Sequence, residues 1–104
     1  MGLPVLTYSG RTFAARVAGS LLHAIGLPEL VTYSPDDYEV LAVKLAHEPG
    51  TLAELKQRLA ANINTAPLFQ TDLFTRHMET TFKTMWERHR RGENPETFTV
   101  ATFP

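Results

Sequence analysis

The chain has 104 residues, 43% of them hydrophobic, and a formal net charge of -1 at pH 7. This length fits one domain with a modest core and excludes a large two-domain enzyme. The balanced charge gives no electrostatic case for binding nucleic acid or an anionic membrane. The absence of cysteine excludes disulfides and thiolate chemistry; it fits a reducing cytoplasm, and it fits a cysteine-free secreted protein nearly as well. No signal peptide or membrane-spanning segment is visible, and we expect a cytoplasmic location.

The chain begins with a predicted strand, turn and helix in immediate succession. A short apolar run followed by Thr7 and Tyr8 is typical of a buried parallel strand, near residues 4–8. Gly10 can adopt a positive φ where the chain turns, and Thr12 can cap a helix over residues 12–25. The apolar positions expected to face the core of that helix are Phe13, Val17, Leu21 and Ile25.

A second strand is predicted near residues 29–33, after Gly26 and Pro28 end the helix. Strand, helix and strand in this order form a βαβ unit, so the predicted fold class is α/β. Ligands of open α/β sheets bind beyond the carboxyl ends of the strands, where free backbone N–H groups of a turn favour anions or sugar hydroxyls. Arg11 or Arg16 could add a charge-assisted contact. The turn from Ser9 to Thr12 is therefore the candidate ligand site.

Two helices are predicted in the middle of the chain. Ser34, Pro35 and two first-turn aspartates indicate the start of a helix over residues 35–47. Thr51 and Glu54 match a capping box for a helix over residues 51–62.

The last predicted helix covers residues 71–91 and is rich in aromatic side chains. Its large apolar residues recur every three or four positions, which is typical of a core face: Phe74, Met78, Phe82, Met85 and Trp86. In the tail, the alternation of TFTVATF is compatible with a strand, whereas its prolines and terminal position are equally compatible with a mobile end.

No catalytic residue or metal ligand is predicted from spacing. The four histidines are scattered over three helices without metal-ligand spacing. Asp36 and Asp37 are adjacent, so they do not face one another, and helix capping explains them better than acid–base chemistry.

Three separated blocks of this sequence resemble one known family. They are GLPVLTYSGRTFAARVAGSLLHAIGLPELV, LAVKLA and PLFQTDLFTRHMETTFKTMW, in that order. The order and spacing resemble the C-terminal end of the O-linked N-acetylglucosamine transferases, especially the bacterial forms that follow tetratricopeptide repeats. The resemblance implies that residues 1–95 are the C-terminal part of the Rossmann-like, nucleotide-sugar-binding domain of a GT-B glycosyltransferase, with residues 96–104 as a tail.

The resemblance also implies a reaction. Such a transferase moves N-acetylglucosamine from uridine diphosphate N-acetylglucosamine to protein serine or threonine, with no metal or other cofactor. The family residues that hold the uridine diphosphate, neutralise the leaving diphosphate and face the acceptor lie upstream of the GLPVLT block and have no counterpart here. The isolated chain is therefore expected to be inactive. Gly10, Arg11 and Thr12 are carried over only as donor-side or supporting positions.

The partners implied are the rest of the glycosyltransferase, its tetratricopeptide repeats and a protein acceptor. A two-stranded sheet would also leave an unpaired edge, so a homodimer of this chain is a further expectation. The alternative interpretation is a stand-alone α/β interaction module without catalysis, which docks through the aromatic face of its last helix.

Overall fold

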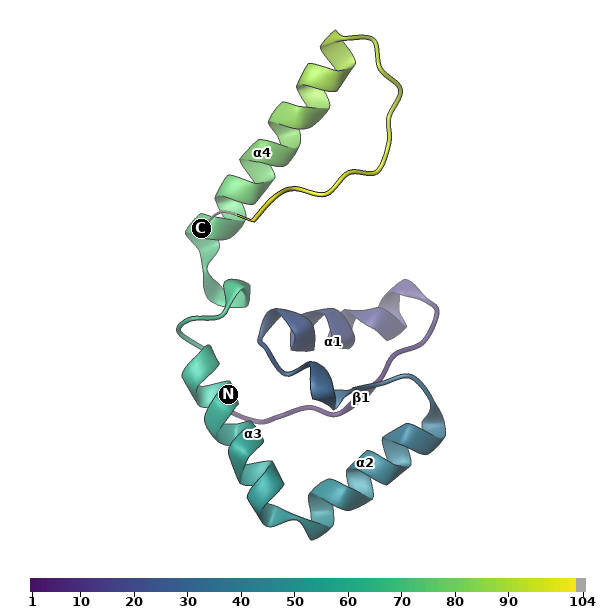
Figure 1. Ribbon diagram of the computed structural model, residues 1–104, viewed down its shortest axis with the longest axis vertical. Helices are drawn as coiled ribbons and strands as arrows, with labels where there is room; N and C mark the ends of the chain where they lie inside the picture. The colour runs from purple at the N-terminus through teal and green to yellow at the C-terminus, as the bar shows by residue number, and fades with distance from the viewer. Residues whose placement is uncertain (103–104) are drawn as a thin grey trace. The chain divides into compact units, whose positions relative to one another are not determined.

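A computed structural model describes residues 1–102 of the chain and contains two compact units, Met1–Phe69 and Gln70–Pro104. The elements of the first unit are β1 (Thr7–Tyr8), α1 (Phe13–Ala24), the 3-10 turn η1 (Pro28–Leu30), β2 (Val31–Thr32), α2 (Pro35–His47), α3 (Pro49–Asn62) and the 3-10 turn η2 (Pro67–Phe69) (Figure 1). The described part of the second unit consists of α4 (Thr71–Arg90) and a tail without regular secondary structure.

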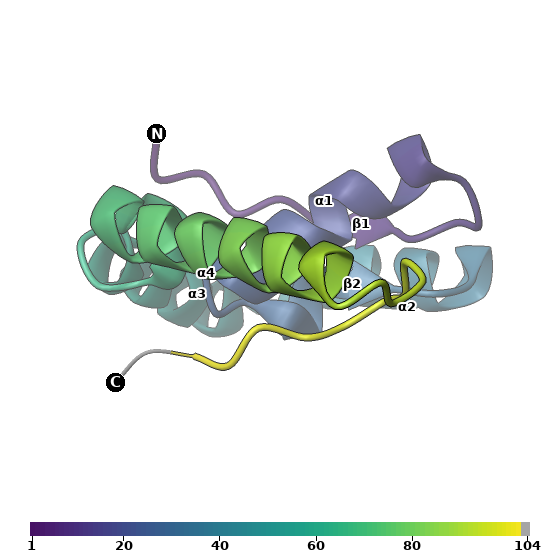
Figure 2. The ribbon, with the colours of Figure 1, turned by 90° about the horizontal axis from the view of Figure 1, so that it is seen from above.

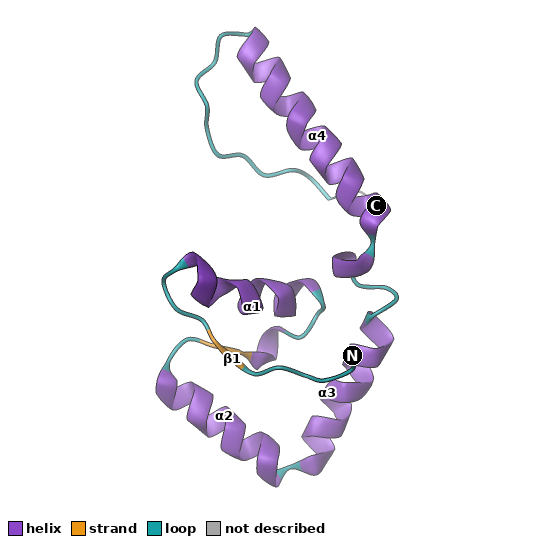
Figure 3. Cartoon of the chain, turned by 180° about the vertical axis from the view of Figure 1, so that it is seen from behind, coloured by secondary structure: helices purple, strands orange, loops and turns teal. Residues whose placement is uncertain are grey.

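The two strands pair in parallel, with Thr7 opposite Val31 and Tyr8 opposite Thr32. Helices α1 and α2 flank this pair on opposite sides (Figure 3). The parallel βαβ arrangement predicted from the sequence is therefore confirmed. The strands are shorter than the predicted 4–8 and 29–33, because Pro4 has no N–H to donate to a ladder and Pro28 begins a 3-10 turn instead.

The predicted caps of α1 and α2 are confirmed. The Thr12 hydroxyl accepts a hydrogen bond from the backbone N–H of Ala15 at 3.2 Å, and the Ser34 hydroxyl accepts one from Asp37 at 3.1 Å. Gly26 follows α1 with φ of 79°, and the N–H of Leu27 donates to the carbonyl of Leu22 at 2.8 Å, which is the Schellman ending.

Helix α3 begins at Pro49, two residues before the predicted start at residue 51. Proline fits the first helical position, so Thr51 lies inside the helix and the predicted capping box with Glu54 is wrong. The Thr51 hydroxyl instead donates to Glu48 Oε2 at 2.9 Å.

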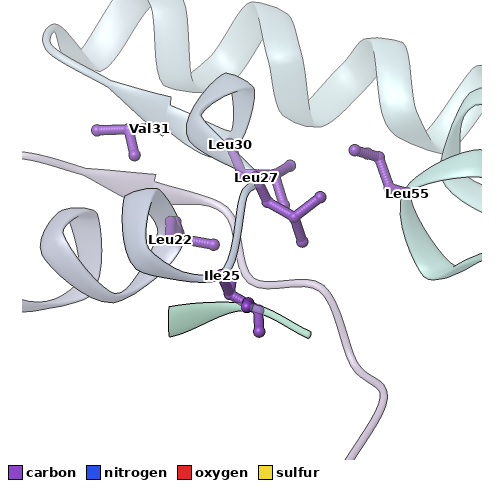
Figure 4. Close-up of a cluster of buried hydrophobic side chains, with 7 residues drawn as sticks. Leu22, Ile25, Leu27, Leu30, Val31 and Leu55 are labelled. Carbon is purple, nitrogen blue, oxygen red and sulfur yellow. The ribbon is translucent and has the colours of Figure 1, made fainter. Parts of the chain in front are cut away.

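The core of the first unit is formed by side chains from α1, η1, β2, α3 and the connections next to them (Figure 4): Leu22, Ile25, Leu27, Leu30, Val31, Leu55 and Ala66. The predicted inward row of α1 is wrong in three of its four positions, since Phe13, Val17 and Leu21 are 82%, 40% and 48% exposed. Gly19 explains the difference. An added Cβ at Gly19 would lie 3.4 Å from Val31 Cγ1, so the small residue lets that face of α1 approach the sheet.

One buried hydroxyl joins the two strands. Thr32 Oγ1 donates to the carbonyl of Thr7 at 2.8 Å, and Thr32 is the buried polar residue of β2. We expect Thr32→Val to lower the free energy of unfolding by about 1 kcal/mol, because the Thr7 carbonyl loses a buried partner. Urea unfolding measures this. Thr75→Val is the control, since the exposed Thr75 hydroxyl bonds only to Thr71 of its own helix, and an equal loss in both variants would contradict the assignment.

Helix α3 also holds the end of α1. Asn62 Nδ2 donates to the carbonyl of Ile25 at 2.8 Å, and Arg58 Nη2 donates to the carbonyl of Gly26 at 2.9 Å. Arg58 also forms an ion pair with Glu29. Partial burial raises the pKa of the Glu29 carboxyl, but the hydrogen bond and charge of Arg58 outweigh burial and hold that pKa below its ordinary value of 4.5.

This ion pair gives a pH-dependent prediction. A carboxyl whose pKa is depressed by folding adds stability above its unfolded pKa, and that stability is lost as the pH falls through the folded pKa. We therefore expect Glu29→Gln to be less stable than the natural chain at about pH 7, with a smaller difference at about pH 3. Urea unfolding at both pH values measures the difference. Glu39→Gln, on the exposed surface of α2, is the control, and an equal loss of stability in the two variants at about pH 7 would contradict a role for the ion pair.

The second unit has no buried side chain on its helix. Helix α4 was predicted to place its aromatic row in a core, but all five of those residues are exposed. The described part of the tail runs back along the helix (Figures 1 and 2). Arg88 holds it there, donating to Glu96 Oε1 and to the carbonyl of Asn94, both at 3.1 Å.

Candidate functional site

The predicted ligand turn connects the carboxyl end of β1 to the amino end of α1. Its first two N–H groups are already bonded: Ser9 donates to Thr32 at 2.8 Å and Gly10 donates to Ala15 at 3.2 Å. Free backbone N–H groups were expected in this turn, but those of Ser9 and Gly10 are bonded within the chain. In the chain as described, the glycines with positive φ are Gly2, Gly26 and Gly92, so the positive φ predicted for Gly10 is wrong as well.

Gly10 is nevertheless sterically required. An added Cβ at this position would lie 2.8 Å from the Cβ of Ala15, closer than carbon atoms approach one another. The glycine lets the turn fold back onto the first turn of α1. Glycine is therefore needed at position 10 because the backbone lies close to Ala15, and not because its φ is positive.

Arg11 and Thr12 complete the turn. Arg11 is exposed, and no ion pair of its guanidinium is found among the residues that the structure describes. No acidic residue lies in the first turn of α1, so no side-chain charge there offsets the positive end of the helix dipole. The turn thus combines one unpaired cation with a helix amino terminus, an arrangement suited to an anion or to sugar hydroxyls. The site assignment of Gly10, Arg11 and Thr12 stays a prediction.

The cap of α1 can be tested directly. We expect Thr12→Ala to lower the free energy of unfolding by about 1 kcal/mol, because the N–H of Ala15 loses its side-chain acceptor. Thr12→Ser should keep the stability, since serine offers the same hydroxyl. Thermal unfolding of the two variants compares them, and equal losses would contradict a capping role.

Sequence reasoning missed an apolar groove of about 410 Å³ in the first unit. The N-terminal segment, α1, the end of α3 and η2 line it, with Leu3, Val5, Leu21, Ile63 and Phe69 among the lining residues. The apolar character of residues 3–6 is the sequence signal for this groove, but the same pattern is typical of a buried strand.

The adjacent aspartates and the possible metal ligands do not form a functional site in the described part of the chain. Asp36 and Asp37 are exposed in the first turn of α2, where the Ser34 cap engages Asp37. Within the described part of the chain, no group of three His, Asp or Glu side chains could hold a metal ion. Likewise, no helix described is long and apolar enough to cross a membrane.

Comparison with known proteins identifies the class to which this βαβ unit belongs. The model of glycosyl transferase family 41 matches residues 1–78. The chain therefore belongs to glycosyl transferase family 41, as the resemblance of its sequence blocks implied.

Named relatives agree with the family. The chain is 36% identical over 95 residues to a protein of Petunia hybrida named probable UDP-N-acetylglucosamine–peptide N-acetylglucosaminyltransferase SPINDLY, covering 91% of this chain and 10% of the relative. It is 37% identical over 100 residues to a protein of Arabidopsis thaliana named probable UDP-N-acetylglucosamine–peptide N-acetylglucosaminyltransferase SEC. This match covers 95% of this chain and 10% of the relative. The chain thus spans about a tenth of the length of the curated relatives it matches.

Proposed function

We propose that this chain is a C-terminal segment of a protein O-N-acetylglucosaminyltransferase, which moves N-acetylglucosamine from uridine diphosphate N-acetylglucosamine to protein serine or threonine. The family match over residues 1–78 carries the proposal, and the names of the relatives supply the donor and the peptide acceptor. The stand-alone interaction module is not favoured, because the relatives match almost the whole chain as part of much longer proteins.

We further propose the Rossmann-like domain of a GT-B enzyme as the parent fold, with residues 1–95 inside it and residues 96–104 as its tail. Parallel strands occur in sheets that are covered on both faces, and a pair of strands is too small to be independently stable. Helix α1 is apolar on two sides: Leu22 and the C-cap residue Ile25 are buried in the core, whereas Phe13 and Val17 are exposed. A helix that is apolar on two sides is typical of the interior of a larger domain.

The proposed reaction sets the tasks of the protein. The bond between the anomeric carbon and the diphosphate oxygen breaks, and the acceptor hydroxyl oxygen forms the new bond while it loses its proton. The enzyme must stabilise the negative charge of the leaving diphosphate and accept that proton. In this chain Arg11 and the amino end of α1 are suited to the donor side, with Gly10 and Thr12 shaping the turn. We propose that the remaining polypeptide supplies the catalytic groups and that no metal or other cofactor is used.

The partners proposed are the remaining glycosyltransferase polypeptide, its tetratricopeptide repeats and the protein acceptor, with a homodimer of the isolated chain as a further proposal. No nucleic acid or membrane partner is proposed. We propose the cytoplasm as the location, with which the cysteine-free sequence is compatible.

A chimaera tests the proposal. The stretch of the Arabidopsis thaliana SEC relative that aligns with this chain is replaced by this chain, and transfer of labelled N-acetylglucosamine to protein is measured. A panel of other uridine and guanosine diphosphate sugars is run in parallel, because the donor is proposed from the names of relatives. Transfer of a different sugar only would contradict the proposed donor while keeping the transferase.

The same chimaera tests the donor-side turn. We expect Arg11→Ala to raise the KM for the nucleotide sugar by about tenfold or more, the effect of losing one charge-assisted contact of about 1.5 to 3 kcal/mol. Lys56→Ala is the matched control, since Lys56 is exposed on α3, away from the turn in the sequence. An Arg11→Ala enzyme with unchanged KM would contradict the donor-side assignment.

A further inference from the structure

The carboxyl end of α1 is bound by two polar side chains from α3, Arg58 and Asn62, which we call the α3 pair. Asn62 Nδ2 donates to the carbonyl of Ile25 at 2.8 Å, and Arg58 Nη2 donates to the carbonyl of Gly26 at 2.9 Å. Arg58 Nη1 pairs with Glu29 in the following turn. An added Cβ at Gly26 would lie 2.8 Å from Asn62 Nδ2, so the amide packs directly against the backbone that ends α1.

Helix α1 is packed at its carboxyl end and not at its amino end. Its buried residues are Gly19 and Leu22, whereas none of residues 13–18 is buried. At the amino side, the bond from the N–H of Ser9 to the carbonyl of Thr32 fixes the end of β1, which precedes the helix. Both α1 and the end of α3 line the apolar groove, so apolar contact between these two helices is incomplete. The hydrogen bonds of the α3 pair join the helices where that contact is missing.

The amino end of α1 carries the donor-side turn. Gly10 donates to the carbonyl of Ala15, so the part of the turn that holds Arg11 and Thr12 moves with the helix. A helix of 12 residues is about 18 Å long, so a tilt of about 5° about its carboxyl end moves its amino end by about 1.5 Å. A misplacement of about 1 Å at a binding group can cost up to about a hundredfold in rate. The direction of α1 therefore decides where Arg11 meets a ligand.

We propose that Arg58 and Asn62 are positioning residues for the nucleotide sugar, because they fix the direction of α1 and through it the place of Arg11. The inference rests on the proposed function for the identity of the ligand. It adds a requirement from α3. Both side chains bond to the carboxyl end of α1 and the turn lies at the amino end, so their effect on the donor passes through the helix.

Donor kinetics of the chimaera with the SEC relative test the proposal. Asn62→Ala removes one hydrogen bond to α1, and Arg58→Lys keeps the charge but loses the planar fork that serves two acceptors. We expect each variant to raise the KM for the nucleotide sugar by about three- to tenfold, with kcat changed by less than about twofold. Ser34→Ala is the matched control, because it removes one capping hydrogen bond from α2 and should lower the unfolding temperature to a similar extent. Its KM should not change.

A double variant separates positioning from stability. If Asn62 acts through Arg11, then Arg11→Ala combined with Asn62→Ala should raise the KM no further than Arg11→Ala alone. A role in stability alone predicts another pattern, because a smaller folded fraction lowers the apparent kcat and leaves the KM unchanged. A KM of Asn62→Ala equal to that of Ser34→Ala would overturn the proposal. A double variant whose KM rises by the product of the two single effects would overturn it as well.

The isolated chain gives a readout that does not depend on transfer. We expect Asn62→Ala to shift the NMR amide signals of Gly10 and Ala15, at the opposite end of α1, and Ser34→Ala to leave them in place. Unshifted signals in Asn62→Ala would overturn the proposal. Shifted signals together with an unchanged KM would overturn the assignment to the nucleotide sugar. Shifted signals together with a chimaera that folds but transfers no sugar would support the link from α3 to the turn and contradict the transferase proposal.

Discussion

Leu27→Ala is expected to lower the free energy of unfolding of the isolated chain by about 2 to 5 kcal/mol. Leu27 is 1% exposed and follows the Schellman ending of α1, so it packs at the centre of the core of the first unit. Truncation removes apolar contacts and leaves a cavity that the short η1 turn cannot close. Since small domains have only about 5 to 15 kcal/mol of stability, this loss is a large share of the total.

Urea unfolding followed by far-ultraviolet circular dichroism measures the effect. Leu3→Ala is the matched control, because the same atoms are removed from a side chain that is 69% exposed. We expect the control to change the free energy of unfolding by no more than about 0.5 kcal/mol. Similar losses in the two variants would show that the core does not lie where the structure places it.

The isolated chain is not expected to bind uridine diphosphate N-acetylglucosamine measurably. The turn offers one unpaired arginine and the amino end of α1, and two of its N–H groups are bonded within the chain. Each missing charge-assisted contact is worth about 1.5 to 3 kcal/mol, and each 1.4 kcal/mol is a factor of about ten in affinity. Two or three missing contacts therefore move a micromolar site beyond millimolar. Isothermal titration calorimetry decides this, and micromolar binding by the isolated chain would contradict the proposed division of labour.

Local chemistry made much of the first unit predictable from the sequence. The caps at Thr12 and Ser34 and the glycine ending at Gly26 depend on residues within one or two turns, and all three were placed correctly. Parallel pairing also followed from the sequence, because a helix between two apolar runs is the usual parallel connection.

Tertiary packing decided what the sequence pattern left ambiguous. Helix α1 has apolar residues on two sides, and the buried side is the one on which Gly19 lies close to Val31. The same applies to α4, whose spacing predicted a core face that no described residue of the second unit buries. Periodicity shows that a face is apolar, but it does not show which polypeptide covers it.

The position of the candidate turn between β1 and α1 was predictable from the sequence, but its internal geometry was not. The turn lies where a parallel βα unit places its ligands, but the role of Gly10 depends on a contact with Ala15 that no local rule anticipates. The family was predictable because long blocks of sequence agree in order and spacing, and the match to residues 1–78 confirms it.

The initial rate of N-acetylglucosamine transfer by the chimaera tests the central claim most directly. Three enzymes are compared at equal concentration: the SEC relative, the same relative with the aligned stretch deleted, and the relative carrying this chain in place of that stretch. If this chain is a working segment of a family 41 transferase, the chimaera should transfer N-acetylglucosamine at a rate within about tenfold of the SEC relative, a difference in activation free energy of about 1.4 kcal/mol. A chimaera that folds cooperatively but transfers no faster than the deleted enzyme would contradict the claim.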